Sequence, residues 1–142
     1  MQAALRVALA ACVRDEVPVG AVVVREGELI AEAHNEMGRR ADPTAHAELL
    51  AIQRALMKLG TDRLTDATLY ITLEPCAQCA GAMVLAKIGR VVFGAYDGRA
   101  GMAGSVFDLL RHPRLNHGAE VIGGIMAEEC GALLKRFFLA RR

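Results

Sequence analysis

The sequence predicts a single α/β domain in which helices cover both faces of a mixed β-sheet. After an initial pair of strands, segments with strand character alternate with segments of helical periodicity, which is typical of layered α/β proteins. The 142 residues are 54% apolar and only 4% aromatic, enough for one largely aliphatic core. No repeat, linker or low-complexity tract divides the chain, so we expect residues 1–142 to form one domain.

Five segments have the composition of β-strands. They are rich in β-branched residues, or they alternate apolar residues with threonine and tyrosine. The predicted strands are residues 19–24, 29–34, 67–73, 91–93 and 121–122. Glu26 and Gly27 separate the first two and favour a β-hairpin, whereas the later strands follow helical segments. The sheet is therefore expected to be mixed.

Apolar residues at three- and four-residue spacing mark the helical segments. The predicted helices are residues 2–13, 43–59, 75–88, 106–111 and 127–142, with loops at 35–41 and 94–105. Pro43 suits the first turn of a helix that Asp42 would cap and Gly60 would end. In the same way, Pro75 is expected to begin a helix that closes at Gly89.

The composition excludes several classes of protein. No apolar run approaches the roughly 20 residues that a membrane helix needs. The first residues also lack the basic and long apolar regions of a signal peptide, so we expect a cytoplasmic protein that does not contact membranes. The net charge of +1 does not by itself indicate nucleic-acid binding, and any basic surface must be local.

One histidine, two cysteines and one glutamate form a candidate catalytic zinc site. Cys76 and Cys79 are one helical turn apart at an expected helix start, where the positive end of the helix dipole favours the thiolates that bind zinc. His46, near the start of the preceding helix, supplies a third ligand. Three protein ligands leave one zinc position for water, and Glu48 would carry protons to and from it.

Two structural alternatives compete with this catalytic interpretation. One is a closed zinc site with four protein ligands, and the other is a Cys-x-x-Cys redox pair; in both, Glu48 would simply be exposed. The residues that could supply a fourth ligand lack motif spacing: Cys12, Cys130, His34, His112 and His117. A redox pair would need neither His46 nor Glu48. Residues two apart do not share a helix face, so these two side chains can converge only within the first turn.

Further blocks of sequence match one family of deaminases. His-x-Glu followed by Pro-Cys-x-x-Cys is the known signature of the wider superfamily of zinc nucleobase deaminases. The more specific blocks are residues 17–21, 42–48, 73–76, 79–83, 89–94, 104–105, 115–117, 129–130, 137–138 and 141–142. Through these blocks the chain resembles the bacterial tRNA-specific adenosine deaminases over almost its whole length.

The resemblance implies a cytidine-deaminase-like fold, with three α/β/α layers and a five-stranded mixed sheet, and it implies a homodimer. It also implies one Zn²⁺ per subunit, held by His46, Cys76 and Cys79. In such enzymes zinc-bound hydroxide attacks C6 of a flipped adenine, and Glu48 would be the proton shuttle. The implied product is inosine at the wobble position of a tRNA anticodon.

The resemblance also assigns RNA contacts. Asn35 and the backbone at Ala47 match positions that contact the flipped base, and Asp97 matches one that contacts the neighbouring nucleotide. Phe138 is a candidate for stacking on a base. The candidate phosphate contacts are basic: Arg39, Arg40, Arg99, Arg111, Arg114, Lys135, Arg136, Arg141 and Arg142. Departures from residues common in the family fall at Gln78, Tyr96 and Arg99.

Two other functions share many of these features. A small-molecule deaminase of the same fold would act on guanine, cytosine or a nucleoside, and residues 42–48 do not discriminate against it. The loop after Gly94 and the basic tail favour RNA instead. A non-catalytic RNA-binding subunit stabilised by zinc is the third hypothesis, but such a protein would have no need of Glu48.

Overall fold

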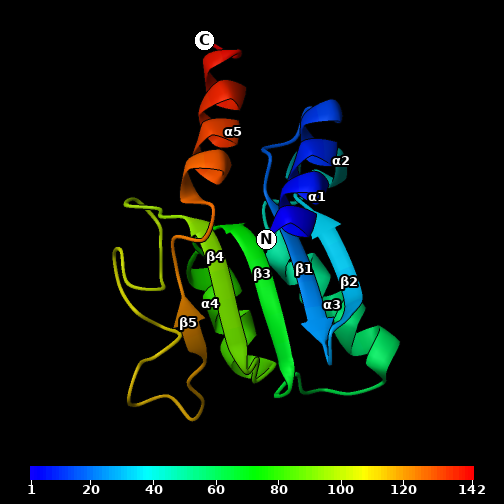
Figure 1. Cartoon of the computed structure of the whole chain (residues 1–142), viewed down its shortest axis with the longest axis vertical. Helices are drawn as coiled ribbons and strands as arrows, with labels where there is room; N and C mark the ends of the chain where they lie inside the picture. Colours follow the sequence, from blue (N-terminus) through cyan, green and yellow to red (C-terminus); the bar gives the residue numbers. More distant parts are fainter.

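The computed structural model describes all of residues 1–142 and contains a five-stranded sheet with helices on both faces (Figure 1). Its strands are β1 (Gly20–Arg25), β2 (Glu28–His34), β3 (Ala67–Leu73), β4 (Arg90–Ala95) and β5 (Glu120–Ile122). Its helices are α1 (Gln2–Val13), α2 (Met37–Arg40), α3 (Ala47–Leu59), α4 (Ala77–Leu85) and α5 (Ala127–Leu139). None of these helices combines the length and the apolar character that crossing a bilayer requires.

The sheet is mixed and has the strand order β2-β1-β3-β4-β5. β1 pairs antiparallel with β2 and β3, whereas the β3–β4 and β4–β5 pairs are parallel. Glu26 and Gly27 both have positive φ, 53° and 74°, which matches the twist of a tight β-hairpin. A parallel pair needs a crossover, and α4 provides it between β3 and β4. The predicted fold class is confirmed.

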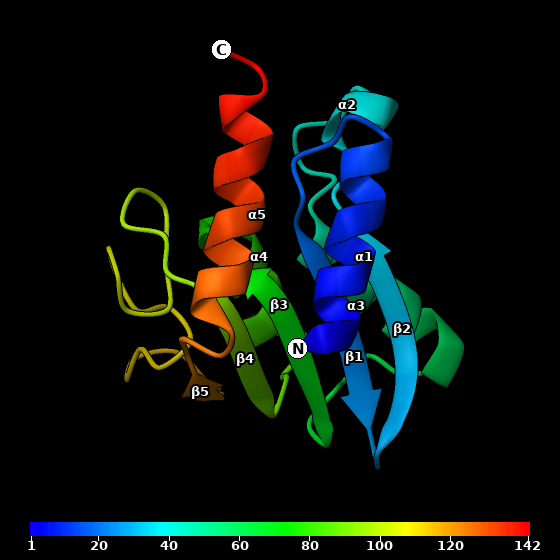
Figure 2. The ribbon, with the colours of Figure 1, turned by 45° about the horizontal axis from the view of Figure 1, so that its top comes forward.

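Two helices cover each face of the sheet (Figure 2). α1 and α5 lie side by side on one face, and α3 and α4 lie on the other. The larger core lies under α3 and α4, where strand side chains meet the apolar stripe of α3: Leu50, Ile52, Leu69, Ile71, Val91 and Phe93. Burying such a side chain contributes about 1.5–3 kcal/mol, so this core fixes the position of both helices on the sheet.

The layer under α1 is thinner, because alanine and glycine face each other there. Ala4 and Ala8 are fully buried against Gly20 at the start of β1. A Cβ atom at Gly20 would lie 2.1 Å from the carbonyl oxygen of Ala4 and 2.6 Å from the backbone nitrogen of Ala8. Since these are backbone atoms, only a shift of the whole helix could relieve the clash.

Gly20→Ala is therefore expected to lower the free energy of unfolding by about 3 kcal/mol, at the upper end of the usual cost of overpacking. Gly131→Ala in α5 is the matched control, because a Cβ there meets nothing within 4 Å. That change should be neutral or stabilise the protein by up to about 1 kcal/mol through helix propensity. Urea unfolding of both variants checks the prediction, and equal stabilities would contradict the close packing of α1.

The start of α3 differs from the prediction. The helix begins at Ala47 rather than at Pro43. Asp42 does not cap it, because its carboxylate accepts hydrogen bonds from the backbone N–H and the hydroxyl of Thr44 and closes a turn instead. His46 takes the N-cap position with an extended backbone, φ −78° and ψ 149°. The histidine therefore precedes the helix.

The boundaries of α4 also differ from the prediction. The helix begins at Ala77 rather than Pro75, with Cys76 as its N-cap, and it ends at Leu85. Gly89 does not close it. A Cβ at Gly89 would lie 2.3 Å from the backbone carbonyl oxygen of Thr65, just before β3. This glycine therefore allows two backbone segments to approach each other closely.

Three smaller corrections concern the connections and the C-terminus. The predicted loop at 35–41 contains the short helix α2, because the Glu16 carboxylate accepts hydrogen bonds from two of its backbone N–H groups. Residues 106–111 form turns and one end of an isolated β-bridge, not a helix. α5 ends at Leu139 rather than Arg142. Each correction depends on contacts that are remote in sequence or on fraying at a chain end.

Candidate active site

Two helix starts bring one nitrogen atom and two sulfur atoms together. His46 is the N-cap of α3, Cys76 is the N-cap of α4, and Cys79 lies in the first turn of α4. The Nδ1 atom of His46 is 3.5 Å from the Sγ atom of each cysteine. Tetrahedral zinc with its usual Zn–N and Zn–S bond lengths would separate such donors by roughly 3.5 Å. The spacing of the cluster therefore fits a zinc ion.

No further histidine, cysteine or carboxylate belongs to this cluster, in which all donor atoms lie within 4.8 Å of one another. A metal ion held by the three side chains would keep one coordination position free of protein, as catalytic zinc sites do and closed structural sites do not. The donor set is one imidazole and two thiols, which suits zinc better than a hard cation such as magnesium.

The two thiols of the cluster differ in acidity. A hydrogen bond from Cys79 lowers the pKa of Cys76 to about 5, and His46 acts in the same direction. That hydrogen bond, together with burial, raises the pKa of Cys79. The first thiolate of the pair therefore forms more readily than the second. A divalent cation would favour the thiolate form of both residues, so metal binding should release a proton.

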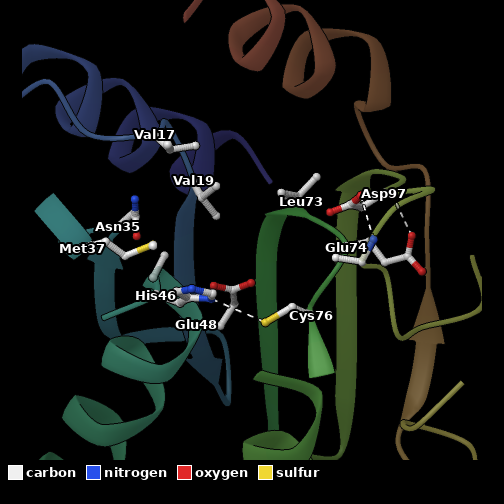
Figure 3. A pocket seen from close by; sticks show the side chains of 12 residues that line it. Val17, Val19, Asn35, Met37, His46, Glu48, Leu73, Glu74, Cys76 and Asp97 are labelled. Carbon is white, nitrogen blue, oxygen red and sulfur yellow. Dashed lines mark hydrogen bonds between the residues drawn. The ribbon is translucent and has the colours of Figure 1, made fainter. Parts of the chain in front are cut away.

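Glu48 lies beside the cluster and is only 4% exposed. Figure 3 shows its carboxylate between His46 and Cys76. Burial raises the pKa of Glu48 to about 7, against the opposing effects of its own backbone N–H and of His46. A carboxyl group poised near neutrality can both accept and return protons. His46 and Glu48 can converge because the histidine stands before the helix and not on one of its faces.

A cavity of about 210 Å³ adjoins the cluster (Figure 3). Three of the four residues predicted to contact the substrate line it: Asn35, Ala47 and Asp97. Phe138 does not. It lines an adjoining groove with Tyr96, and Asp97 borders both the groove and the cavity. Phe138 is 52% exposed, so its ring is accessible to a nucleotide that extends from the cavity.

Sequence reasoning missed most of the apolar wall of the cavity. That wall consists of small and aliphatic side chains and one methionine: Val17, Val19, Met37, Leu73 and Ala100. An apolar wall suits the face of an aromatic base, and the few polar groups between these residues would fix its orientation. The only signal in the sequence that could have found these residues is their position: three of the five lie inside the blocks that carry the family resemblance.

Three groups hold Asn35 in place at the edge of the cavity. Its backbone N–H donates to the carbonyl oxygen of Val19 at 3.1 Å, and its own carbonyl oxygen lies 2.9 Å from Nδ1 of His34. Its side-chain amide donates to the buried carboxylate of Glu16 at 3.5 Å. The other ring nitrogen of His34 lies 3.1 Å from Arg14. These contacts orient Asn35 before any ligand binds. They also give both ring nitrogens of His34 a structural partner, so His34 is not needed as a metal ligand.

The remaining histidines and cysteines lie outside the cluster. The ring of His117 hydrogen-bonds to the carbonyl oxygen of Ile88 at 2.7 Å, and His112 accepts the backbone N–H of Arg114 at 3.2 Å. Cys130 belongs to α5 and is buried against the other face of the sheet. These residues have structural partners of their own, which agrees with the absence of motif spacing.

The nine candidate phosphate contacts fall into two groups. Three of them form ion pairs with carboxylates of this chain: Arg40, Arg111 and Arg141. The other six form none: Arg39, Arg99, Arg114, Lys135, Arg136 and Arg142. Arg141 also stacks on the ring of Phe137, with its guanidinium carbon 3.4 Å from the ring centroid. The unpaired group is the better candidate for binding an anionic ligand.

The mixed five-stranded sheet and the His/Cys/Cys cluster at two helix starts define a deaminase of the cytidine-deaminase-like class. The MafB19-like deaminase family matches residues 1–142. The tRNA-specific adenosine deaminase of Bacillus subtilis (strain 168) is 50% identical over 138 residues, which cover 97% of this chain and 86% of that protein. The chain belongs to the family of tRNA-specific adenosine deaminases, and it is an enzyme.

Solved structures agree with this assignment. One from a study of A-to-I editing by tRNA:A34 deaminases at the wobble position of transfer RNA is 41% identical, with a TM-score of 0.89 over 94% of this chain and 96% of that chain. Guanine deaminase from Nitrosomonas europaea is 26% identical, with a TM-score of 0.78 over 96% and 81% of the two chains. The fold is thus shared by enzymes that act on RNA and on a free base.

Proposed function

We propose that this protein converts the wobble adenosine of a tRNA anticodon to inosine by zinc-dependent hydrolysis. The proposal depends on one observation: the cluster of His46, Cys76 and Cys79 lies beside the buried Glu48 at a single cavity. The family supports adenosine in tRNA as the substrate, since the Bacillus relative bears that activity in its name.

The residues of the chain have separate tasks in this reaction. His46, Cys76 and Cys79 would hold the zinc ion, which would supply a water molecule of lowered pKa as the nucleophile. Glu48 would accept one proton from that water and pass it to the ring nitrogen, and would then accept the second proton and pass it to the departing amine, so that it ends the reaction unchanged. Its raised pKa suits both directions of transfer, because neither protonation state is strongly favoured near neutrality. Burial of Glu48 also keeps bulk water from competing for the proton.

Asn35, Ala47 and Asp97 are the proposed contacts to the RNA around the reacting atom. The reacting carbon of adenine is inaccessible in a stacked strand, so the base must turn out of the loop and enter the cavity. Asn35 and the backbone at Ala47 would bind the edge of the base. Asp97 and Phe138 line the adjoining groove and would contact the neighbouring nucleotide there. The arginines without ion pairs are the proposed phosphate contacts, and the homodimer is likewise proposed from the family.

The substrate is tested by incubating the zinc-loaded protein with an anticodon stem-loop that carries a wobble adenosine, and separately with adenosine, guanine and cytidine. We expect inosine in the stem-loop, with kcat/KM for each free compound lower by a factor of about 100 or more, because remote binding energy is absent. Faster turnover of guanine would make the protein a small-molecule deaminase. Tight binding of RNA without turnover would make it a non-catalytic subunit.

A further inference from the structure

Glu74 is a buried carboxylate that takes no part in the metal cluster. It is only 2% exposed, although it borders the cavity. Figure 3 shows its carboxylate directed away from Cys76 and toward the backbone of Asp97. Removing a carboxylate from water is strongly unfavourable unless hydrogen bonds compensate for the lost hydration. The partners of Glu74 therefore indicate its role.

Four hydrogen bonds connect Glu74 to a single loop, residues 97–105. One carboxylate oxygen accepts the backbone N–H of Asp97 at 2.9 Å and the hydroxyl of Ser105. The other accepts the backbone N–H groups of Ala103 at 3.1 Å and Ser105 at 3.0 Å. Both ends of the loop are thus attached to one side chain, which lies two residues before a proposed zinc ligand.

Gly101 packs against the same carboxylate from inside the loop. A Cβ atom at Gly101 would lie 2.4 Å from both Cδ and Oε2 of Glu74, so only glycine lets the loop fold this closely around the side chain. At the other side of the loop, Asp97 Oδ1 accepts the backbone N–H groups of Arg99 at 2.9 Å and Ala100 at 3.2 Å. The loop therefore has one defined shape.

We propose that Glu74 is a positioning residue for the substrate: by folding residues 97–105 around its carboxylate, it fixes Asp97 and Ala100 in the wall of the cavity. The inference rests on the proposed function, because it assigns this loop to RNA binding. Glu74 forms no hydrogen bond with the metal cluster or with Glu48. Its loss should therefore weaken substrate binding more than the chemical step.

Glu74→Gln tests this division. Glutamine keeps the shape of the side chain, but it turns one acceptor oxygen into a donor that faces N–H and O–H groups. We expect KM for the anticodon stem-loop to rise about tenfold, kcat to fall less than about threefold, and the zinc content to stay unchanged. An unaltered KM, or a loss of zinc and kcat without a change in KM, would overturn the proposal.

Gly101→Ala disturbs the same contact from the other side and leaves the carboxylate intact. The added methyl group should push the loop off Glu74 and reproduce the rise in KM with little change in kcat. Gly118→Ala is the control, because its Cβ would lie 3.7 Å from the nearest neighbouring atom, an ordinary contact. Its kinetics should match those of the unaltered protein. Equal kinetics for both glycine variants would contradict the role of the loop.

Hydrogen exchange of the free protein gives a readout without substrate. The amides of Asp97, Ala103 and Ser105 donate to Glu74, so they should exchange about tenfold faster or more in Glu74→Gln. The amides of β3 should keep their protection. Unchanged exchange in the loop would overturn the inference itself. An unaltered protein that deaminates no RNA would instead refute the proposed function, so the two failures are distinguishable.

Discussion

Glu48→Gln protein is expected to bind as much zinc as the unaltered protein and to lose nearly all deaminase activity. Of the three carboxylates that border the cavity, those of Glu48, Glu74 and Asp97, only that of Glu48 lies between His46 and Cys76. Glutamine fills the same buried space but cannot accept and return a proton. Loss of general acid–base catalysis typically lowers kcat by a factor of about 10²–10⁴. We expect a fall in that range with KM changed by less than about fivefold.

The measurement combines single-turnover inosine formation with metal analysis and thermal unfolding of the same preparation. Retained zinc and an unchanged Tm would show that the loss lies in the chemical step. A Glu48→Gln protein with more than about a tenth of the original kcat would remove Glu48 from its assigned role. Loss of zinc in this variant would place the carboxylate among the ligands, which the cluster geometry argues against.

The clustering of His46, Cys76 and Cys79 could be predicted from the sequence because the information for it is local. Cys76 and Cys79 are separated by one helical turn, and such spacing places two sulfur atoms together whatever the rest of the chain does. The side chains of His46 and Glu48 lie close together in space, but for a different structural reason than expected. The prediction placed both in one helix, whereas the structure places the histidine on the extended N-cap and the glutamate within the first turn.

The parts of the site that sequence could not predict depend on remote partners. Glu74 bonds groups that are 23 to 31 residues away, and Glu16 reaches Asn35 and α2 across 19 to 23 residues. No periodicity encodes such contacts. The turn at Asp42 is a second kind of failure: aspartate before proline fits a helix cap and a turn equally well, and the side-chain bonds to Thr44 decide in favour of the turn.

Cys79→Ser should lose metal and stability together. Cys79 is fully buried in the first turn of α4, and a serine hydroxyl is a poor substitute for a thiolate as a zinc ligand. Because the donors come from two separate helix starts, binding of zinc joins these elements and adds directly to the free energy of folding. For a ligand present at about 100 times its Kd, that contribution is about 2.7 kcal/mol, so zinc should no longer raise the Tm of this variant by several degrees.

Cys130→Ser separates this effect from the loss of any buried sulfur. Cys130 lies in α5 on the other face of the sheet, is 1% exposed and packs against Gly94, so its removal should lower stability without affecting zinc. Thermal unfolding of both variants with added zinc and with a chelator gives four values of Tm. Zinc should raise the Tm of Cys130→Ser as it does that of the unaltered protein, and it should leave Cys79→Ser unchanged. A Cys79→Ser protein that holds one zinc per chain and still responds to the chelator would show that the metal is bound by other residues, and the open coordination position on which the proposed reaction depends would then lose its structural basis.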